Sequence, residues 1–142
     1  MATVEAIGHL NDCIKLNPND NQGLRYKLLH WLLVINDLIS ASEFVSEKPY
    51  GENSYAFLNF SQSLYLFKKF GNFSNKFISA LKNAHRCNPY VIKYLTGELR
   101  IPKTEPEHYS LGSKEEAIIY ATLSIEAWKD APELISILKD LK

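Results

Sequence analysis

The sequence repeats apolar residues at intervals of three and four, and this spacing constrains the fold more than any other feature. One stripe runs through Leu24, Leu28, Trp31 and Ile35, and four more have the same spacing. Each stripe places its apolar residues on one face of an α-helix. Long alternating runs of β-branched residues, which are typical of half-buried strands, do not occur. We therefore expect an all-α protein.

Proline and glycine mark the breaks between the stripes and divide the chain into about seven helices. Breaks are expected at residues 17–20, 48–51, 71–72, 88–89 and 97–112. Ser113 and Glu116, which precede an apolar run, are typical of a capping box, in which two side chains bond the first amides of a helix. A chain of 142 residues is long enough to bury one core, so we expect a single domain over residues 1–142.

Two helix ends share a pattern that indicates a helical repeat. A large apolar residue stands eight positions before both Pro18 and Pro89, and a small residue stands five positions before each. The two prolines are 71 residues apart, close to two units of the roughly 34-residue repeat of tetratricopeptide proteins. Small residues let paired helices approach closely, and proline ends the second helix. The expected architecture is a tetratricopeptide-like stack of antiparallel helical hairpins.

The ten residues from Leu16 to Arg25 read LNPNDNQGLR. This segment resembles the LNPNDNQG-x-R signature of a group of tetratricopeptide-like proteins, mostly uncharacterised bacterial proteins, which includes the suppressor-of-tumorigenicity-7 family. The segments NPYV at 88–91 and GSKEEA at 112–117 resemble the carboxyl-terminal half of the bacterial members. The resemblance implies a helical-repeat module that is used for binding and has no catalytic residues.

Binding residues are expected on the concave side of the stack, which the first helix of each hairpin builds. Amides and a guanidinium placed there can hold the backbone or a carboxylate of a bound peptide. The candidate peptide-binding residues are Asn21, Gln22, Arg25, Tyr55, Asn59 and Gln62. The competing interpretation of residues 16–25 is a plain turn between two helices. We predict a non-catalytic module, an adaptor or scaffold, that binds a protein or peptide.

The middle of the chain is basic, although the whole chain has no net charge. Residues 61–103 contain eight Lys or Arg and one acidic residue. The predicted basic patch consists of Lys68, Lys69, Lys76, Lys82 and Arg86. Aromatic residues lie between these cations, an arrangement that can hold phosphates and stack bases, but the Phe residues follow the core period. A solvated face, a surface for an acidic protein and, least favoured, a nucleic-acid-associated regulatory protein are the alternatives.

Residues that catalyse reactions or bind metals do not group in the sequence. The four histidines share no i, i+4 spacing, and the two cysteines are 74 residues apart. The six glycines are scattered and form no phosphate-binding loop. We therefore expect no enzyme, no metal site and no cofactor.

Two segments predict contacts beyond a simple stack. The N-terminal helix has no preceding helix to cover it, so we expect an uncovered apolar edge that permits self-association. The segment 97–112 is long for a connection. We expect it either to act in binding or to cover the last groove, held by Leu99, Ile101, Tyr109 and Leu111.

The sequence also bears on location. The chain start lacks the basic and apolar regions of a signal peptide. The most apolar run, Leu28 to Ile35, includes His30 and is far shorter than the roughly 20 residues that cross a bilayer. A cytoplasmic protein without membrane contact is expected.

Overall fold

The computed structural model describes residues 4–16, 22–45, 55–71 and 74–141, and of residues 22 and 23 only the backbone. All regular structure in these ranges is helical. The helices are α1 (Val4–Leu16), α2 (Gln22–Val34), α3 (Leu38–Ala41), α4 (Ala56–Phe70), α5 (Asn75–Cys87), α6 (Val91–Leu95), α7 (Lys114–Lys129) and α8 (Pro132–Leu141). The all-α prediction is confirmed over the described ranges, where the short helices α3 and α6 bring the number to eight.

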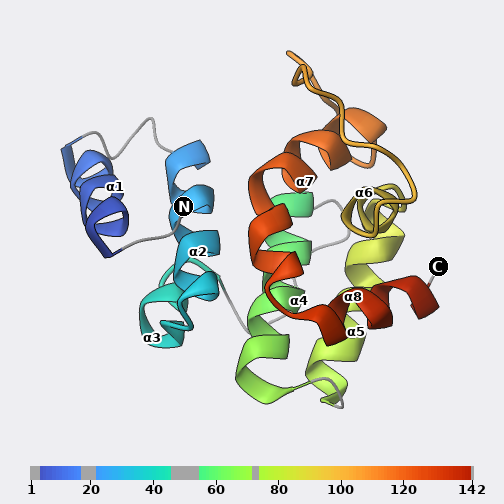
Figure 1. The fold of residues 1–142 in the computed structure, drawn as a ribbon, viewed down its shortest axis with the longest axis horizontal. Helices are drawn as coiled ribbons and strands as arrows, with labels where there is room; N and C mark the ends of the chain where they lie inside the picture. The colour runs from blue at the N-terminus through green and yellow to red at the C-terminus, as the bar shows by residue number, and fades with distance from the viewer. Residues whose placement is uncertain (1–3, 17–21, 46–54, 72–73, 142) are drawn as a thin grey trace.

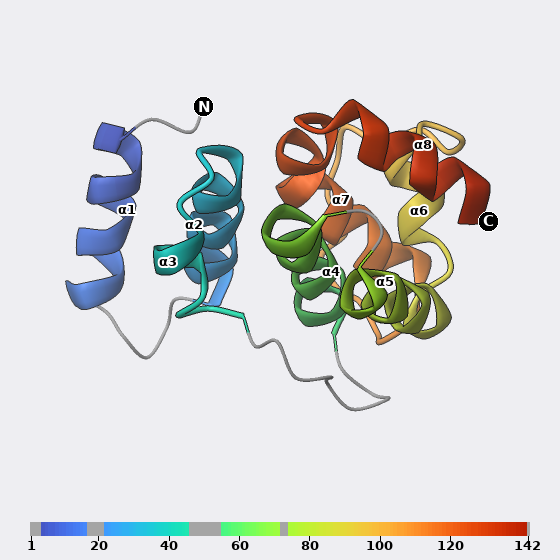
Figure 2. The ribbon, with the colours of Figure 1, turned by 90° about the horizontal axis from the view of Figure 1, so that it is seen from below.

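The helices form a stack with α4 and α7 in the middle. Figures 1 and 2 show α1, α2 and α3 at one end and α5, α6 and α8 at the other. Helix α7 contacts α2, α4, α6 and α8, while α4 and α5 pack against each other. In a linear repeat protein each unit contacts only its neighbours. The contact of α7 with α2 departs from that rule, so this packing does not establish the tetratricopeptide-like form of the stack.

Helix α4 lies inside the stack and is enclosed on nearly all sides. All residues from Ala56 to Phe67 are buried except Leu58, which is half-buried. The serines among them are hydrogen-bonded: the Ser63 hydroxyl donates to the Phe60 carbonyl at 2.7 Å, and Ser61 Oγ lies 3.1 Å from His30 Nε2. Burying polar groups costs little when they are hydrogen-bonded in this way.

The start of α7 is fixed by the predicted cap and by a wider set of bonds. Ser113 Oγ accepts the Glu116 N–H at 3.1 Å, which confirms the first half of the capping box. The Glu116 carboxylate accepts the N–H of Gly112 at 3.1 Å, the N–H of Ala56 at 3.2 Å and the Asn88 side-chain amide at 2.8 Å. One buried carboxylate thus joins the starts of α4 and α7 to the end of α5.

Gly112 lets the chain pass close to the end of α5. Its φ is 77°, and a Cβ atom there would stand 3.1 Å from the carbonyl oxygen of Cys87. Both the backbone conformation and the lack of space favour glycine.

The N-terminal helix is covered by its neighbour. Leu10 and Ile14 of α1 are buried and α1 contacts α2, so the apolar edge that motivated self-association is not open. Its exposed large apolar residues, Val4 and Leu16, lie at its two ends. None of the described helices combines the length and apolar content that a membrane span requires.

The segment 97–112 is held by only part of the predicted set. Leu99 and Ile101 pack against the core, and the Leu99 N–H donates to the Lys93 carbonyl at 2.9 Å. Tyr109 and Leu111 are instead 43% and 45% exposed. The first part of the segment therefore covers the stack, while Tyr109 is directed to a cavity.

Candidate functional site

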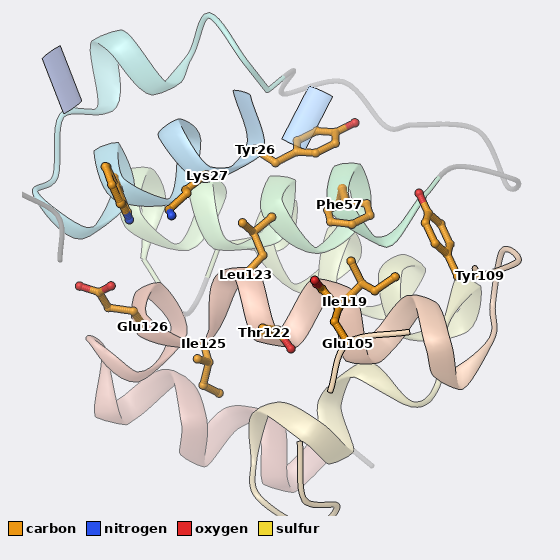
Figure 3. Close-up of a pocket in the computed structure, with 11 residues that line it drawn as sticks. Tyr26, Lys27, Phe57, Glu105, Tyr109, Ile119, Thr122, Leu123, Ile125 and Glu126 are labelled. Carbon is orange, nitrogen blue, oxygen red and sulfur yellow. The ribbon is translucent and has the colours of Figure 1, made fainter. Parts of the chain in front are cut away.

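A cavity of about 600 Å³ lies between α2, α7, the start of α4 and the segment before α7 (Figure 3). We name it the α2–α7 groove. Its lining residues are Tyr26, Lys27, Trp31, Phe57, Glu105, Tyr109, Ile119, Thr122, Leu123, Ile125 and Glu126. Most of these side chains are aromatic or aliphatic, which is the usual composition of a ligand site.

The aromatic side chains of the groove are fixed by one another. Tyr26 and Phe57 stack with their ring centroids 4.8 Å apart and their planes 9° apart. Tyr109 meets Phe57 edge to face at 6.3 Å and meets Tyr55 in the same way at 6.3 Å. Because such arrangements are the favoured ones for ring pairs, the aromatic wall is ordered before any ligand arrives.

Charged groups stand around this apolar centre. Figure 3 shows Glu126 at the Lys27 end of the groove and Tyr109 at the opposite end. The Lys27 ammonium lies 5.1 Å from the centroid of the Trp31 ring, a cation–π contact. Burial raises the pKa of Tyr109, with smaller contributions from Tyr55 and the Glu116 carboxylate. The described lining thus combines two carboxylates with one ammonium that already rests on an aromatic ring.

A chain of buried hydrogen bonds lies behind the groove. The Trp128 N–H donates to the Tyr120 oxygen at 3.0 Å, and the Tyr120 hydroxyl lies 3.3 Å from Ser61 Oγ. Ser61 Oγ lies 3.1 Å from Nε2 of His30, whose Nδ1 lies 2.7 Å from the Tyr26 carbonyl oxygen. A carbonyl can only accept, so Nδ1 carries the hydrogen and Nε2 is an acceptor. Two hydroxyls lie within reach of Nε2, that of Ser61 at 3.1 Å and that of Tyr120 at 3.4 Å. The chain connects Trp128 to the backbone of Tyr26.

The ionisation of this chain follows from its burial. Burial lowers the pKa of His30 to about 4, against a smaller opposing effect of its bond to the Tyr26 carbonyl. Burial also raises the pKa of Tyr120 to about 12. His30 is therefore uncharged and Tyr120 protonated at neutral pH.

Ser61 and His30 are placed like a nucleophile and its base, but a substrate in solvent cannot reach them. Their exposed fractions are 0% and 2%, and neither lines the α2–α7 groove. Over the part of the chain that the structure describes, no three His, Cys, Asp or Glu side chains gather as metal ligands.

The structure separates the predicted peptide-binding residues. Asn21 and the side chain of Gln22 lie outside the described residues. Arg25 is exposed and lines a smaller cavity of about 220 Å³ with Tyr26 and Glu43. Tyr55 lies beside Tyr109 at the edge of the α2–α7 groove.

The prediction requires Asn59 and Gln62 to face open solvent, but the structure buries both side chains. They are 1% and 2% exposed, because α4 is enclosed by its neighbours instead of forming an outer concave face. Gln62 does line a second cavity, of about 530 Å³, between α4 and α5. We name this cavity the α4–α5 groove; it is lined by Gln62, Leu66, Asn75, Lys76, Ser79, Ala80, Asn83 and Arg86.

The residues of the predicted basic patch do not form one surface, because they lie in different environments. Lys68 bonds Asp130 at 3.2 Å and also donates to Asn36 Oδ1 at 3.3 Å. Lys69 lies over the rings of Tyr65 and Phe70. Lys76 and Arg86 line the α4–α5 groove, whereas Lys82 is exposed and does not. Phe67 and Phe77 pack together in the core at 5.3 Å and so cannot stack on bases.

Sequence reasoning missed most of the α2–α7 groove. Phe57 and Trp31 stand on apolar stripes, a position that predicts burial in the core. Tyr26 stands off the stripe of its own helix, between Arg25 and Lys27, and an aromatic ring between two cations is a usable signal. Nothing in the sequence brings Glu105 and Tyr109 to α2, since that contact depends on the packing of α7.

The chain matches no family model, and the searches of curated proteins and of solved structures give no match either. The tetratricopeptide-like resemblance therefore stays a prediction that rests on its motifs.

Proposed function

We propose that the protein is a non-catalytic module that binds a protein or peptide segment in the α2–α7 groove. The observation that carries this proposal is the lining itself, an open cavity of about 600 Å³ with ordered aromatic rings. Tyr, Trp and Phe are the residue types that concentrate in protein interfaces and in their energetic hot spots. The groove contains all three, in Tyr26, Trp31, Phe57 and Tyr109.

The groove favours a particular ligand chemistry. Ile119, Leu123 and Phe57 offer an apolar centre that suits a bulky apolar side chain. Glu105 and Glu126 are exposed and add negative charge, while the Lys27 ammonium is already placed over Trp31. The ligand is accordingly a segment with an apolar anchor and a neighbouring Lys or Arg.

Binding is favoured over catalysis by where the reactive groups lie. The Ser61–His30 pair is enclosed in the core, and His30 is held neutral by burial. The groove lining offers Glu105, Glu126 and Lys27, all three exposed to solvent. Such groups suit recognition of charge at the edge of an interface.

A selection from displayed random peptides tests the proposal. The purified protein serves as target, and the Leu123→Arg variant, which places a charge in the groove, serves for counter-selection. A matched variant outside the groove, Ser136→Arg at an exposed position of α8, should retain binding. We expect the selected peptides to share an apolar residue next to Lys or Arg.

Fluorescence then places the bound peptide. Trp31 lines the groove, whereas Trp128, the other tryptophan, is buried in the core. A synthetic selected peptide should change the emission of the wild-type protein and leave the emission of Trp31→Phe unchanged. Peptides that bind the Leu123→Arg protein as tightly as the wild type would contradict the proposal.

A further inference from the structure

We infer that the α4–α5 groove is a second binding site, which takes an acidic peptide segment. This site lies on helices other than α2 and α7 and does not depend on the function proposed for the first groove. Its cavity has a volume of about 530 Å³.

The charge of the groove selects an anionic partner. Lys76 and Arg86 line it, and none of its described lining residues is acidic. The whole of α5 contains no Asp or Glu. An incoming carboxylate therefore meets a lining of positive charge.

The other polar side chains of the lining suit carboxylate and backbone groups. Asn75, Ser79 and Asn83 follow one another at four-residue intervals along α5, so they form one polar row. On the opposite wall, Gln62 of α4 is 2% exposed and lines the cavity from below the surface. Amide and hydroxyl groups of this kind can bond the backbone of an extended segment.

Each of the two cations contacts a neighbouring side chain. Arg86 Nη2 donates to Asn83 Oδ1 at 3.3 Å, which leaves its other N–H groups to donate to a carboxylate. The Lys76 ammonium lies 4.8 Å from the centroid of the Phe70 ring. Lys76 also stands in the first turn of α5, where the helix dipole favours a negative ligand.

The distance between the cations sets the spacing of the acidic residues. Lys76 and Arg86 are ten residues apart on a helix, which corresponds to about 15 Å along its axis. An extended peptide advances about 3.3 Å per residue and presents alternate side chains to the same side. Carboxylates four residues apart therefore reach both cations from one face of the peptide.

A nucleic acid fits this groove less well. Phe67 and Phe77 are buried against each other, and the Phe70 ring already has Lys69 and Lys76 ammonium groups at 5.4 Å and 4.8 Å. Sites for single strands combine a basic track with rings on which bases stack. The α4–α5 groove has two lining cations and no ring among its described lining residues.

Fluorescence anisotropy with a labelled peptide tests the inference. The probe is GESGSEG, in which the two glutamates are four residues apart, and the control peptides are GQSGSQG and GSEEGSG. We expect GESGSEG to bind most tightly, with an affinity that falls as salt is raised. Arg86→Gln and Lys76→Gln should each weaken binding about tenfold, because each removes one charge-assisted contact.

Lys82→Gln is the matched control, since Lys82 is exposed on the same helix but does not line the groove. It should change the affinity less than twofold, and circular dichroism should show all three variants folded. The Leu123→Arg variant should also bind GESGSEG normally, which separates this site from the α2–α7 groove.

Three results would overturn the inference. GESGSEG does not bind at millimolar concentration, GQSGSQG binds equally well, or Lys76→Gln, Lys82→Gln and Arg86→Gln all lose the same affinity. Tighter binding of a dT oligonucleotide that is lost in Arg86→Gln would assign the groove to nucleic acid instead.

Discussion

Ser61 Oγ of α4 lies 3.1 Å from Nε2 of His30 of α2, in the interior of the protein. Tyr120 and Trp128 of α7 extend the same chain of bonds, which ends at the Tyr26 carbonyl. The chain therefore joins the two helices that form the groove through the central helix α4. Since Tyr26 also supplies a ring to the aromatic wall, the groove and the buried network share one helical turn.

The buried His30 predicts that the protein loses stability in mild acid. The pKa of His30 is about 4 in the folded protein and 6.5 in the unfolded chain. Between these values the unfolded chain binds more protons, so the free energy of unfolding falls as the pH is lowered from 6.5 towards 4. The loss attributable to His30 is about 3 kcal/mol over the window. Urea unfolding at a series of pH values measures it.

The His30→Gln variant isolates this contribution from that of the carboxylates. Its free energy of unfolding should vary less between pH 6.5 and 4 than that of the wild type. His85→Gln is the control: the pKa of His85 is lowered by burial and by Lys93, but its side chain is only partly buried, so its effect should be smaller. Parallel pH profiles for wild type and His30→Gln would rule out His30 as the cause.

Glu116 predicts a large loss of stability from a change at a residue that lines neither groove. Its carboxylate accepts bonds from Ala56, Gly112 and Asn88. In Glu116→Ala the N–H groups of Ala56 and Gly112 lose this acceptor, while the Asn88 amide keeps its bond to the Ser113 carbonyl. Buried donors without an acceptor are costly, so we expect a loss of about 3 kcal/mol or more in the free energy of unfolding. Glu115→Ala, at the exposed neighbouring position, should cost less than about 1 kcal/mol. Denaturation curves in urea compare the two variants. Similar losses would contradict the inference that the Glu116 carboxylate holds α4, α5 and α7 together.

Tyr109 predicts an effect on binding without an effect on folding. It lines the α2–α7 groove and is 43% exposed, so Tyr109→Ala should leave the thermal midpoint nearly unchanged. Affinity for a peptide selected on the groove should fall about tenfold or more, as for an aromatic hot spot. Leu111→Ala, in the same segment and 45% exposed but outside the lining, should keep wild-type affinity. Isothermal titration calorimetry measures both, and equal affinities would remove Tyr109 from the site.

Local features of the fold could be predicted because they depend on nearby residues. The apolar stripes predict the long helices, and Ser113 marks the start of α7 by its own chemistry. The enclosure of α4 could not be predicted in this way. Its stripe predicts an outer face for Asn59 and Gln62, but α2, α3, α5 and α7 all pack against α4, and both side chains are buried.

The candidate site depends still more on tertiary packing. Tyr26 and Glu126 are far apart in the sequence, and they line one cavity because α7 returns to pack on α2. In a linear repeat each unit contacts only its neighbours, so the repeat hypothesis does not predict this contact. It predicts binding residues on the first helix of each hairpin instead. The pattern of Phe and Lys in residues 61–103 likewise does not reveal that Lys68 pairs with Asp130 while Lys76 and Arg86 share a groove.

The end of α2 provides a test of backbone geometry that is independent of both grooves. Asn36 has φ 61°, its N–H donates to the Leu33 carbonyl, and the Asp37 N–H donates to the Leu32 carbonyl at 2.9 Å. This pair of bonds is the Schellman motif, in which glycine is favoured at the left-handed position.

Asn36→Gly and Asn36→Ala both lose the bond from Lys68, so the difference in stability between them reports the backbone alone. We expect Asn36→Gly to be more stable by about 1 kcal/mol, or about 3 °C in the thermal midpoint, because alanine is strained in this conformation. Thermal unfolding followed by circular dichroism measures the difference, and an alanine variant as stable as the glycine variant would mean that the helix ends in another way.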